Sequence, residues 1–399
     1  MRKRELTAVL LVAGTCIGGG TIALPMVLAK VGIVPSLLIM IGIWLLNYYP
    51  SLAGAELNLR SEQGLSLGTL GKNFSGRGAQ LVGEISVKVL SYAALTIHLC
   101  GSSSIIQKLL EEYLHCNAST LTIESCIAFS GAVLLFFPFK VISALNNFMF
   151  SCLILVFLML LGAIVSMVDL SEMPLMTNPS MVDLLSVTPV IFAAYGYQLI
   201  LHTLRDYCGK APSMLRKSLF FGSLIPTVVY ILWASSSLSV IFRANPEFFS
   251  QMVAGKVEVG AFVSELAKVS DTQNFQILVW WMSILAILTS FLGVSLGLAE
   301  SLNLSLKDHV ESTGVRKSLA SVLTIVPAYV IAALYPNAFI KILGFAGALF
   351  VVMGILLPVY LLLKNDMSKM YFNELKKWLL ILCVFAGLCV MAAEIFINN

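Results

Sequence analysis

AGTCIGGGTIALPM, residues 13–26, lies inside an apolar segment that is otherwise long enough to cross a membrane. It contains four glycines, Gly14, Gly18, Gly19 and Gly20, and each glycine costs roughly 1 kcal/mol in a helix interior. Three adjacent glycines therefore predict a local unwinding of the helix. Unwound backbone at membrane depth is tolerated only where protein buries it or where it lines a watery cavity. The spacing of Gly14 and Gly18 also fits close packing of two helices, which is the simpler alternative.

The composition requires a lipid environment for most of the chain. Of the 399 residues, 58% are hydrophobic and 12% are charged, whereas soluble domains carry roughly 25% charged residues. A compact soluble protein could not bury this much apolar surface, so we expect the bilayer to cover it. The eight cysteines and four histidines show no ligand spacing. We therefore expect no disulfide framework, metal site or cofactor, and no nucleic-acid partner.

Hydropathy predicts an all-helical polytopic membrane protein with about eleven spans in a single transmembrane domain. The longest connection, Ala244–Asn274, is too short to form a separate domain. The first span is expected to remain uncleaved, because no small-residue cleavage site closes it. The expected spans run near Leu6–Ala29, Ile33–Leu59, Leu81–Leu110, Leu121–Phe139, Leu145–Val168, Leu184–His202, Leu219–Phe242, Phe275–Leu298, Ser318–Leu334, Phe339–Leu363 and Trp378–Ile397.

The distribution of basic residues predicts the orientation of the chain. With the N-terminus in the cytoplasm, the inside segments hold most of the 25 Lys and Arg residues, from Arg2 near the start to Lys369 near the end. The ratio is about three inside to one outside, which the positive-inside rule favours. We therefore expect a cytoplasmic N-terminus and, with an odd number of spans, a C-terminus on the outside.

A second interruption is predicted five spans after the first. The sixth expected span contains PVIFAAYGYQ, residues 189–198, with Gly196 at mid-span. Two interrupted spans that open two halves of five helices are the pattern of an inverted-repeat transporter. Repeat one then covers about residues 6–168 and repeat two about residues 184–363, with an extra helix at about 378–397.

Helix ends at such breaks suit a zwitterionic ligand. A break frees N–H groups at the start of one half-helix and carbonyl groups at the end of the other. The N–H groups near Gly19, Gly20 and Thr21 suit a carboxylate, and the carbonyls of residues 13–15 and 193–195 suit an ammonium group or a cation. An amino acid carries both charges within a few ångströms. The sequence therefore predicts an amino-acid site near the bilayer midplane.

Both interrupted stretches resemble those of a known family. GTCIGGGTIALP, residues 14–25, is similar to the GTxIGxGxxxLP signature of the bacterial hydroxy and aromatic amino acid permeases. FAAYGY, residues 192–197, resembles that family's FxSFGF stretch, with Ala194 in place of Ser. The segment from Tyr92 to Gly101 also looks like theirs. Within the family the likeness is greatest to the tyrosine-specific and tryptophan-specific transport proteins.

The resemblance covers essentially the whole chain. It implies the leucine-transporter type fold, location in a bacterial inner membrane, and import of an aromatic amino acid together with protons. The expected substrate-binding residues lie around the two breaks and in the third span: Gly14, Thr15, Gly18, Gly19, Gly20, Thr21, His98, Phe192, Ala194, Tyr195 and Gly196.

Three aromatic residues near the second break could stack on an aromatic substrate. Helical spacing prevents Phe192, Tyr195 and Tyr197 from sharing one face, so at most two of them contact the ligand. We favour Tyr195, which is beside the break, for an offset or edge-on contact with the substrate ring. Core packing is the alternative for each of the three.

Polar groups within the spans are candidates for ion coupling and gating. His98 is an ionisable group at mid-span, which makes it a candidate for substrate contact or proton relay. The alternative is a neutral histidine that is bonded to a neighbouring carbonyl. The resemblance implies that Thr289 and Ser290 face the unwound part of the first helix and ligate sodium; the alternative is bonding to their own helix. Glu84 and Lys88 are four residues apart, so they either pair with each other or form an inner gate.

The sequence argues against an enzyme. It has no nucleophile–base pair, and the run from Gly18 to Gly20 is no nucleotide-binding motif, since no strand precedes it and no Gly-Lys-Ser/Thr follows. We expect a symporter that couples an aromatic amino acid to protons. Alternatives are sodium coupling, or a carrier for serine, threonine or branched-chain amino acids.

Overall fold

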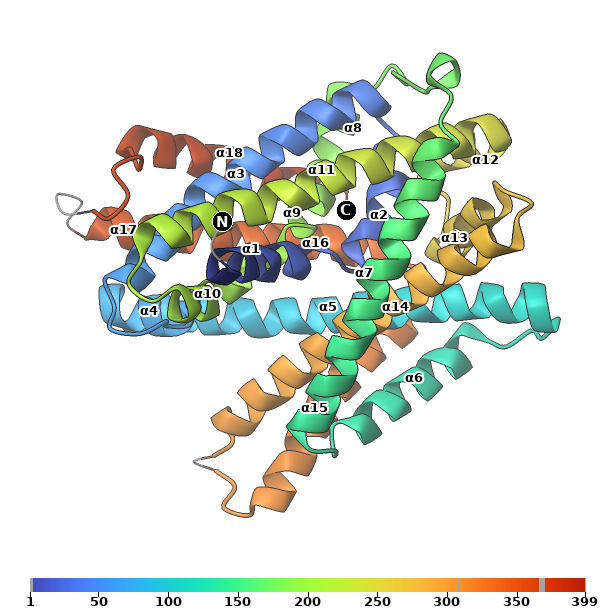
Figure 1. The fold of residues 1–399 in the computed structure, drawn as a ribbon. Coiled ribbons are helices and arrows are strands. Elements are labelled where there is room, and N and C mark those ends of the chain that lie inside the picture. The colour runs from blue at the N-terminus through green and yellow to red at the C-terminus, as the bar shows by residue number, and fades with distance from the viewer. Residues whose placement is uncertain (1–2, 308, 366–369, 399) are drawn as a thin grey trace.

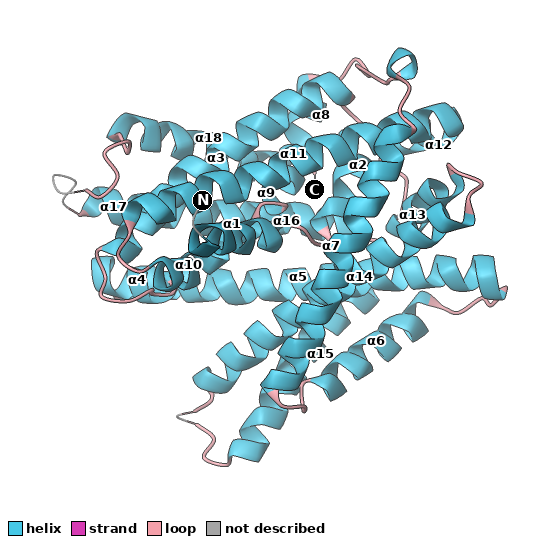
Figure 2. Cartoon of the chain, in the orientation of Figure 1, coloured by secondary structure: helices cyan, strands magenta, loops and turns pink. Residues whose placement is uncertain are grey.

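The structure is a computed structural model that describes residues 3–307, 309–365 and 370–398. Arg2 and Lys369, which contribute to the charge distribution considered above, lie outside the described residues. The described chain is helical and contains no strand, as Figure 2 shows. The expected all-helical class is therefore confirmed.

The helical elements follow one another with short connections. The first part of the chain forms α1 (Lys3–Cys16), α2 (Gly20–Leu28), α3 (Ile33–Leu59), α4 (Leu67–Ser75), α5 (Arg77–Leu114), α6 (Thr120–Leu134), α7 (Phe139–Ser166) and the 3-10 turn η1 (Leu170–Glu172). The second part forms α8 (Met181–Ser186), α9 (Thr188–Ala193), the 3-10 turn η2 (Gly196–Ile200), α10 (Leu201–Cys208), α11 (Pro212–Ala244), α12 (Pro246–Val253), α13 (Val259–Lys268), α14 (Gln273–Ser305), α15 (Thr313–Leu334), α16 (Phe339–Val351), the π-helical turn η3 (Val352–Leu356), α17 (Leu357–Lys364) and α18 (Lys377–Ile397).

Fewer helices than the eleven expected are long enough to cross a membrane. Among the described residues nine are long and apolar enough, or ten when the bent pair α1–α2 counts as one span. The fourth expected span is the exception: α6 has 15 residues, about 22 Å at 1.5 Å per residue, which is less than the ~30 Å hydrocarbon core. It ends before Pro138, as expected where proline disfavours helical backbone in the preceding residue.

Both predicted interruptions are present. Residues 17–19 separate α1 from α2, and the two helices are bent by 58°. In the sixth expected span, α9 ends at Ala193, and the chain passes through the 3-10 turn that begins at Gly196 before it becomes α-helical again at Leu201. The glycines therefore mark the breaks, as the propensity argument predicts.

Both broken spans pack against other helices, and one face of α1 remains exposed, since Leu6 and Leu10 are 48% and 55% exposed. The long helix α11 packs against α1 and α3, α16 packs against α5 and α9, and α14 packs against α5 and α7. In Figure 1, α6, α14 and α15 gather below α5, whereas α3, α11 and α18 lie above it. The breaks are thus enclosed by helices from both halves of the chain.

Many large apolar side chains are exposed on the outer faces of this assembly. Leu38 on α3 is 69% exposed, Phe129 on α6 is 72% exposed and Leu155 on α7 is 62% exposed. Water would penalise so much exposed apolar surface, at roughly 25 cal/mol per Å². The exposed faces are therefore suited to lipid contact, which agrees with the composition.

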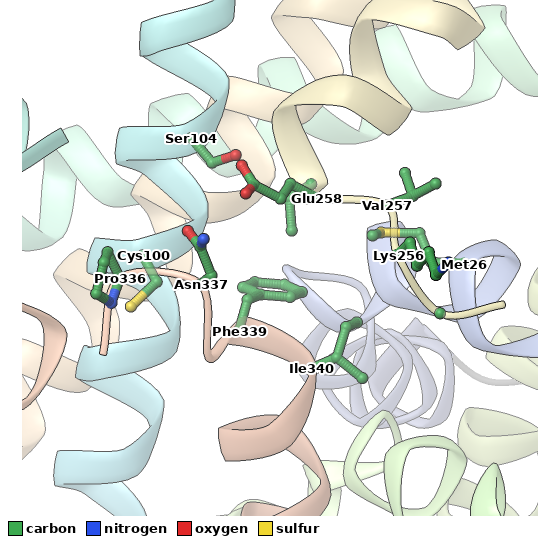
Figure 3. A pocket seen from close by; sticks show the side chains of 12 residues that line it. Met26, Cys100, Ser104, Lys256, Val257, Glu258, Pro336, Asn337, Phe339 and Ile340 are labelled. Atoms are coloured by element: carbon green, nitrogen blue, oxygen red, sulfur yellow. The ribbon is translucent and has the colours of Figure 1, made fainter. Parts of the chain in front are cut away.

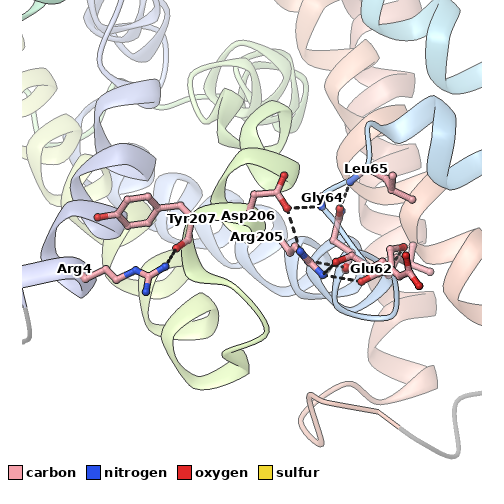
Figure 4. Close-up of polar contacts among 10 residues, drawn as sticks. Arg4, Glu62, Gly64, Leu65, Arg205, Asp206 and Tyr207 are labelled. Atoms are coloured by element: carbon pink, nitrogen blue, oxygen red, sulfur yellow. Dashed lines mark hydrogen bonds and ion pairs between the residues drawn. The ribbon is translucent and has the colours of Figure 1, made fainter.

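A polar network joins the start of the first broken span to the end of the second (Figure 4). Arg4 at the start of α1 donates a 2.7 Å hydrogen bond to the carbonyl of Tyr207 in α10. Arg205, also in α10, donates to the carbonyls of Ser61 and Glu62 in the connection after α3, at 2.7 and 2.6 Å. Charged donors make the stronger hydrogen bonds of proteins, so α1, α3 and α10 are held together at this end.

Candidate substrate cavity at the helix breaks

A cavity of about 640 Å³ lies where the two broken spans meet α5, α7, α14 and α16. This volume is within the range typical of small-molecule sites. Most residues that the sequence singles out line it: Gly14, Thr15, Gly18, Gly19, Gly20, Lys88, His98, Ala194, Gly196, Thr289 and Ser290. The fold therefore brings together residues from four separate parts of the chain.

The first break presents backbone donors to this cavity. Gly18, Gly19 and Gly20 line it, and among the described residues their N–H groups have no hydrogen-bond acceptor. The N–H groups of Thr21 and Ile22 donate to the carbonyls of Gly18 and Gly19, at 2.9 and 3.2 Å. Thr21, which we expected to offer a free donor, is therefore bonded within the first turn of α2 and does not line the cavity.

Two of the glycines are closely covered by polar side chains. A methyl group built on Gly18 would lie 2.6 Å from Oγ of Ser290, and one built on Gly19 would lie 3.2 Å from Cε1 of His98. A side chain at Gly18 would force Ser290 to shift, and one at Gly19 would press on the His98 ring, so both polar side chains lie close to the backbone of the first break. Of the two hydroxyls expected to face the first break, that of Ser290 lies beside it, and His98 brings α5 to the same place.

The second break faces the first across a short gap. A methyl group built on Gly20 would lie 3.4 Å from the Cα atom of Ala194, at the end of α9. One built on Gly196 would lie 2.9 Å from Cζ of Phe350, on α16. The absence of side chains at both glycines therefore lets the two breaks and the Phe350 ring approach each other closely.

The aromatic residues of the second break point away from the cavity. Phe192, Tyr195 and Tyr197 have no exposed surface, and none of them lines the cavity. The hydroxyl of Tyr195 donates a 2.9 Å hydrogen bond to Thr227 on α11, and its ring lies edge-on to Tyr230 at 5.7 Å between centroids. The expected stacking of Tyr195 or Phe192 on the substrate does not fit this placement, because the break turns both side chains into the protein interior.

The aromatic wall instead comes from two residues that the sequence reasoning missed. Phe150 of α7 and Phe350 of α16 line the cavity, and a methyl group on Gly14 would lie 3.0 Å from Cζ of Phe150. Nothing in the sequence separates these two from the other Phe residues among a total of 23. Asn146, a further lining residue, was detectable as a polar side chain within an expected span.

The candidates for ion coupling differ in how they are bonded. The Thr289 hydroxyl donates to the carbonyl of Leu285 in its own helix at 2.8 Å. Ser290 lies beside Gly18, where its hydroxyl faces the first break. Nδ1 of His98 is buried and has no hydrogen-bond partner among the described residues.

Glu84 and Lys88 do not form the ion pair that their spacing allows. Nζ of Lys88 donates a 3.1 Å hydrogen bond to Ser305 on α14, whereas Glu84 accepts one of 2.9 Å from Gln80. Lys88 lines the cavity and Glu84 does not. The cavity therefore extends along α5 from His98 at least as far as Lys88.

A smaller cavity of about 220 Å³ lies beyond the breaks, between α2, α5 and the connections that precede α13 and α16. Figure 3 shows Ser104 and Glu258 near one another on one side of it and Phe339 on another. Phe339 packs on α5, where a methyl group on Gly101 would lie 2.8 Å from Cε2 of Phe339 and 2.9 Å from Ile287. Phe339 and Ile287 therefore pack tightly on α5 beside this second cavity.

Comparison with known proteins agrees with this picture of a membrane carrier. The chain matches the tryptophan/tyrosine permease family over residues 1–398. It is 29% identical to the tyrosine-specific transport system 1 of Haemophilus influenzae, over 91% of this chain and 88% of that protein. It is 26% identical to the tryptophan-specific transport protein of Pseudomonas aeruginosa, over 90% of this chain and 85% of that protein. It is also 24% identical to the glutamine transporter 2 of Aliivibrio fischeri, over 90% and 88%.

These matches confirm the resemblance that the glycine-rich stretch and the FAAYGY stretch carry. They cover nearly the full length of the chain and of its relatives, so they apply to the whole helix assembly rather than to one motif. The chain belongs to the tryptophan/tyrosine permease family and is accordingly a multi-pass membrane transporter, not an enzyme.

Proposed function

We propose that the chain is a secondary active importer of tyrosine, tryptophan or both, and that it works by alternating access around the two helix breaks. The cavity supports this proposal most directly, because it combines unbonded backbone N–H groups at Gly18–Gly20 with the aromatic walls Phe150 and Phe350. These are the two kinds of surface that an aromatic amino acid requires, one for its charged end and one for its ring.

The substrate carboxylate binds the N–H groups of the first break, where the positive end of the α2 dipole adds to the attraction. The substrate ammonium binds the carbonyl groups at the ends of α1 and α9. With the charged end held between the breaks, the ring of the substrate extends toward Phe150 or Phe350. His98 and Ala194 then lie beside the substrate headgroup, because they contact Gly19 and Gly20.

We further propose a fold of two inverted five-helix repeats, at about residues 6–168 and 184–363, followed by an extra helix at about 378–397. This count takes the short helix α6 as one of the five crossings of the first repeat. The observed breaks in the first helix of each half support this division. The charge distribution supports a cytoplasmic N-terminus and an outside C-terminus in a bacterial inner membrane. In that orientation the Lys88 end of the cavity faces the cytoplasm and the smaller cavity beside Glu258 faces outward.

Uptake of labelled tyrosine by cells that carry the chain, with competition by all twenty amino acids, tests the substrate class. Tyrosine and tryptophan should compete at low concentration, whereas serine and leucine should not. Equal inhibition by serine would move the assignment to a hydroxy amino acid carrier. Equal inhibition by glutamine would favour the substrate named for the Aliivibrio fischeri relative.

The coupling ion is proposed to be a proton, and His98 is its proposed carrier. This histidine is buried beside the first break, and its Nδ1 has no hydrogen-bond partner among the described residues. Histidine is the side chain whose charge ordinarily changes near neutral pH. The alternative is sodium, which the position of the Ser290 hydroxyl beside Gly18 favours. Uptake into proteoliposomes with a pH gradient or a sodium gradient imposed separately distinguishes the two.

A further inference from the structure

One face of α11 is bonded to both broken spans. Thr227, Tyr230 and Trp233 are three residues apart, so they lie along one side of this uninterrupted helix. Nε1 of Trp233 donates a 2.9 Å hydrogen bond to the carbonyl of Thr21, at the start of α2. Thr227 accepts the hydroxyl of Tyr195 from the second break. Tyr230, between them, contacts both breaks.

The Tyr230 hydroxyl lies between two backbone carbonyls. It is 2.5 Å from the carbonyl oxygen of Cys16, at the end of α1, and 3.0 Å from that of Ala194, at the end of α9. The side chain has no exposed surface. Cys16 and Ala194 both line the central cavity, so the two carbonyls belong to residues that border the proposed substrate site.

A tyrosine hydroxyl has one proton to donate. It therefore satisfies one of these two carbonyls at a time, and the other keeps capacity for a second donor. The substrate ammonium brings three N–H donors to the same place. The hydroxyl thus sets the separation of the two breaks and leaves an acceptor for the ligand, without itself lining the cavity.

We propose that Tyr230 is a positioning residue for the amino-acid headgroup: it fastens the ends of α1 and α9 to α11, so that the carbonyl pole and the N–H pole form one zwitterion site. This inference rests on the proposed function, in which the ammonium binds these carbonyls. In this proposal the unbroken helix α11 fixes the position of the two broken spans relative to each other.

Tyr230→Phe removes the hydroxyl and keeps the ring. In proteoliposomes that hold the full chain, the KM for labelled tyrosine should rise about tenfold, which corresponds to about 1.4 kcal/mol, while the maximal rate should stay within about twofold of the parent. Hydrogen exchange of the bonded amides of Thr21 and Tyr195 should accelerate together, because both breaks lose their common anchor.

Two further variants separate this role from a general loss of packing. Tyr92→Phe removes a similar hydroxyl, which donates to the Leu323 carbonyl at 2.9 Å in another part of the assembly, so KM and exchange at the breaks should not change. Trp233→Phe removes the bond to Thr21 and keeps an aromatic ring in the core, so exchange should accelerate at the first break and not at the second.

An unchanged KM in Tyr230→Phe, or equal acceleration of exchange in Tyr92→Phe, overturns the proposal. Hydrogen exchange needs no transport, so it tests the anchoring role even if the parent protein fails to take up tyrosine. That failure would contradict the proposed function, whereas absence of accelerated exchange in Tyr230→Phe would contradict the role of Tyr230.

Discussion

Each glycine of the first break has a different neighbour, so substitution of each glycine tests a different contact. Gly18 contacts Ser290, Gly19 contacts His98, and Gly20 faces Ala194 across the gap between the two breaks. A side chain at Gly20 therefore fills the space that the proposed carboxylate site needs. A side chain at either of the other two glycines would press on the polar side chain beside it.

Gly20→Leu should abolish tyrosine uptake and leave membrane insertion intact, because the added side chain separates the ligand from the N–H groups. The measurement is initial uptake, normalised to the amount of protein in the membrane. Gly162→Leu in α7 is the matched control, since a side chain there meets no atom within 4 Å. Normal uptake by Gly20→Leu would show that the glycines serve only to pack the helices.

The two hydroxyls of α14 should respond differently to substitution. Thr289 already donates to its own helix, whereas Ser290 faces Gly18. If sodium drives uptake, Ser290→Ala should weaken sodium-driven accumulation more than Thr289→Val, as measured in proteoliposomes at graded sodium concentrations. If protons drive uptake, both variants should accumulate tyrosine, and His98→Gln should lose pH-driven accumulation. Retention by His98→Gln would remove this histidine as the carrier.

At the residue scale, the residues that line the cavity could be predicted only in part from the sequence. The glycines and His98 could be predicted, because they are unusual residues for a membrane span. The direction of the Tyr195 side chain could not be predicted, because helical spacing no longer fixes it where the helix gives way to the 3-10 turn at Gly196. Phe150 could not be found, since nothing in the sequence separates it from the other aromatic residues of the apolar spans, such as Phe148 two residues before it.

At the element scale, helix α7 contributes one of the two aromatic side chains of the cavity wall, Phe150. Phe150→Ala should raise the KM for tyrosine and tryptophan roughly three- to tenfold, since ring contacts contribute about 0.5–1.5 kcal/mol beyond burial. Phe148→Ala, two residues away, removes a ring that is 67% exposed on the outside of the assembly, and its KM should not change. Equal effects of the two variants would contradict the assignment of this wall.

Helix α14 borders the cavity along a glycine face. Gly293 lines the cavity, and a methyl group added there meets no atom within 4 Å. Larger side chains at this position should therefore occupy substrate space without a clash. At equal amounts of protein in the membrane, tyrosine uptake should be lower in Gly293→Ala than in the parent and lowest in Gly293→Leu. Full activity of Gly293→Leu would place the substrate elsewhere.

The elements themselves were predictable to different degrees. Both breaks follow from glycine propensity, and the long apolar helices follow from hydropathy. The length of α6 did not follow, because the apolar stretch continues past Leu134 while Pro138 ends the helical backbone. Helices α12 and α13 lie within a connection that hydropathy treats only as a long loop.

At the scale of the whole molecule, the two cavities lie on opposite sides of the helix breaks. The larger one reaches Lys88, and the smaller one is bordered by Glu258 and by Phe339, which packs with Ile287 on α5. A carrier exposes its site to one side at a time, so tight packing on one side is what alternating access requires. The proposed alternating access therefore predicts exchange of bound substrate across the membrane and no continuous conduction.

Counterflow in proteoliposomes tests this central claim most directly. Vesicles that hold the purified chain are loaded with unlabelled tryptophan and diluted into a trace of labelled tyrosine, without any ion gradient. The account predicts transient accumulation of labelled tyrosine above its outside concentration, saturable, absent from vesicles loaded with serine, and abolished by Gly20→Leu. Entry of tyrosine that never exceeds equilibrium and does not depend on internal tryptophan would contradict a carrier with its substrate site at the helix breaks.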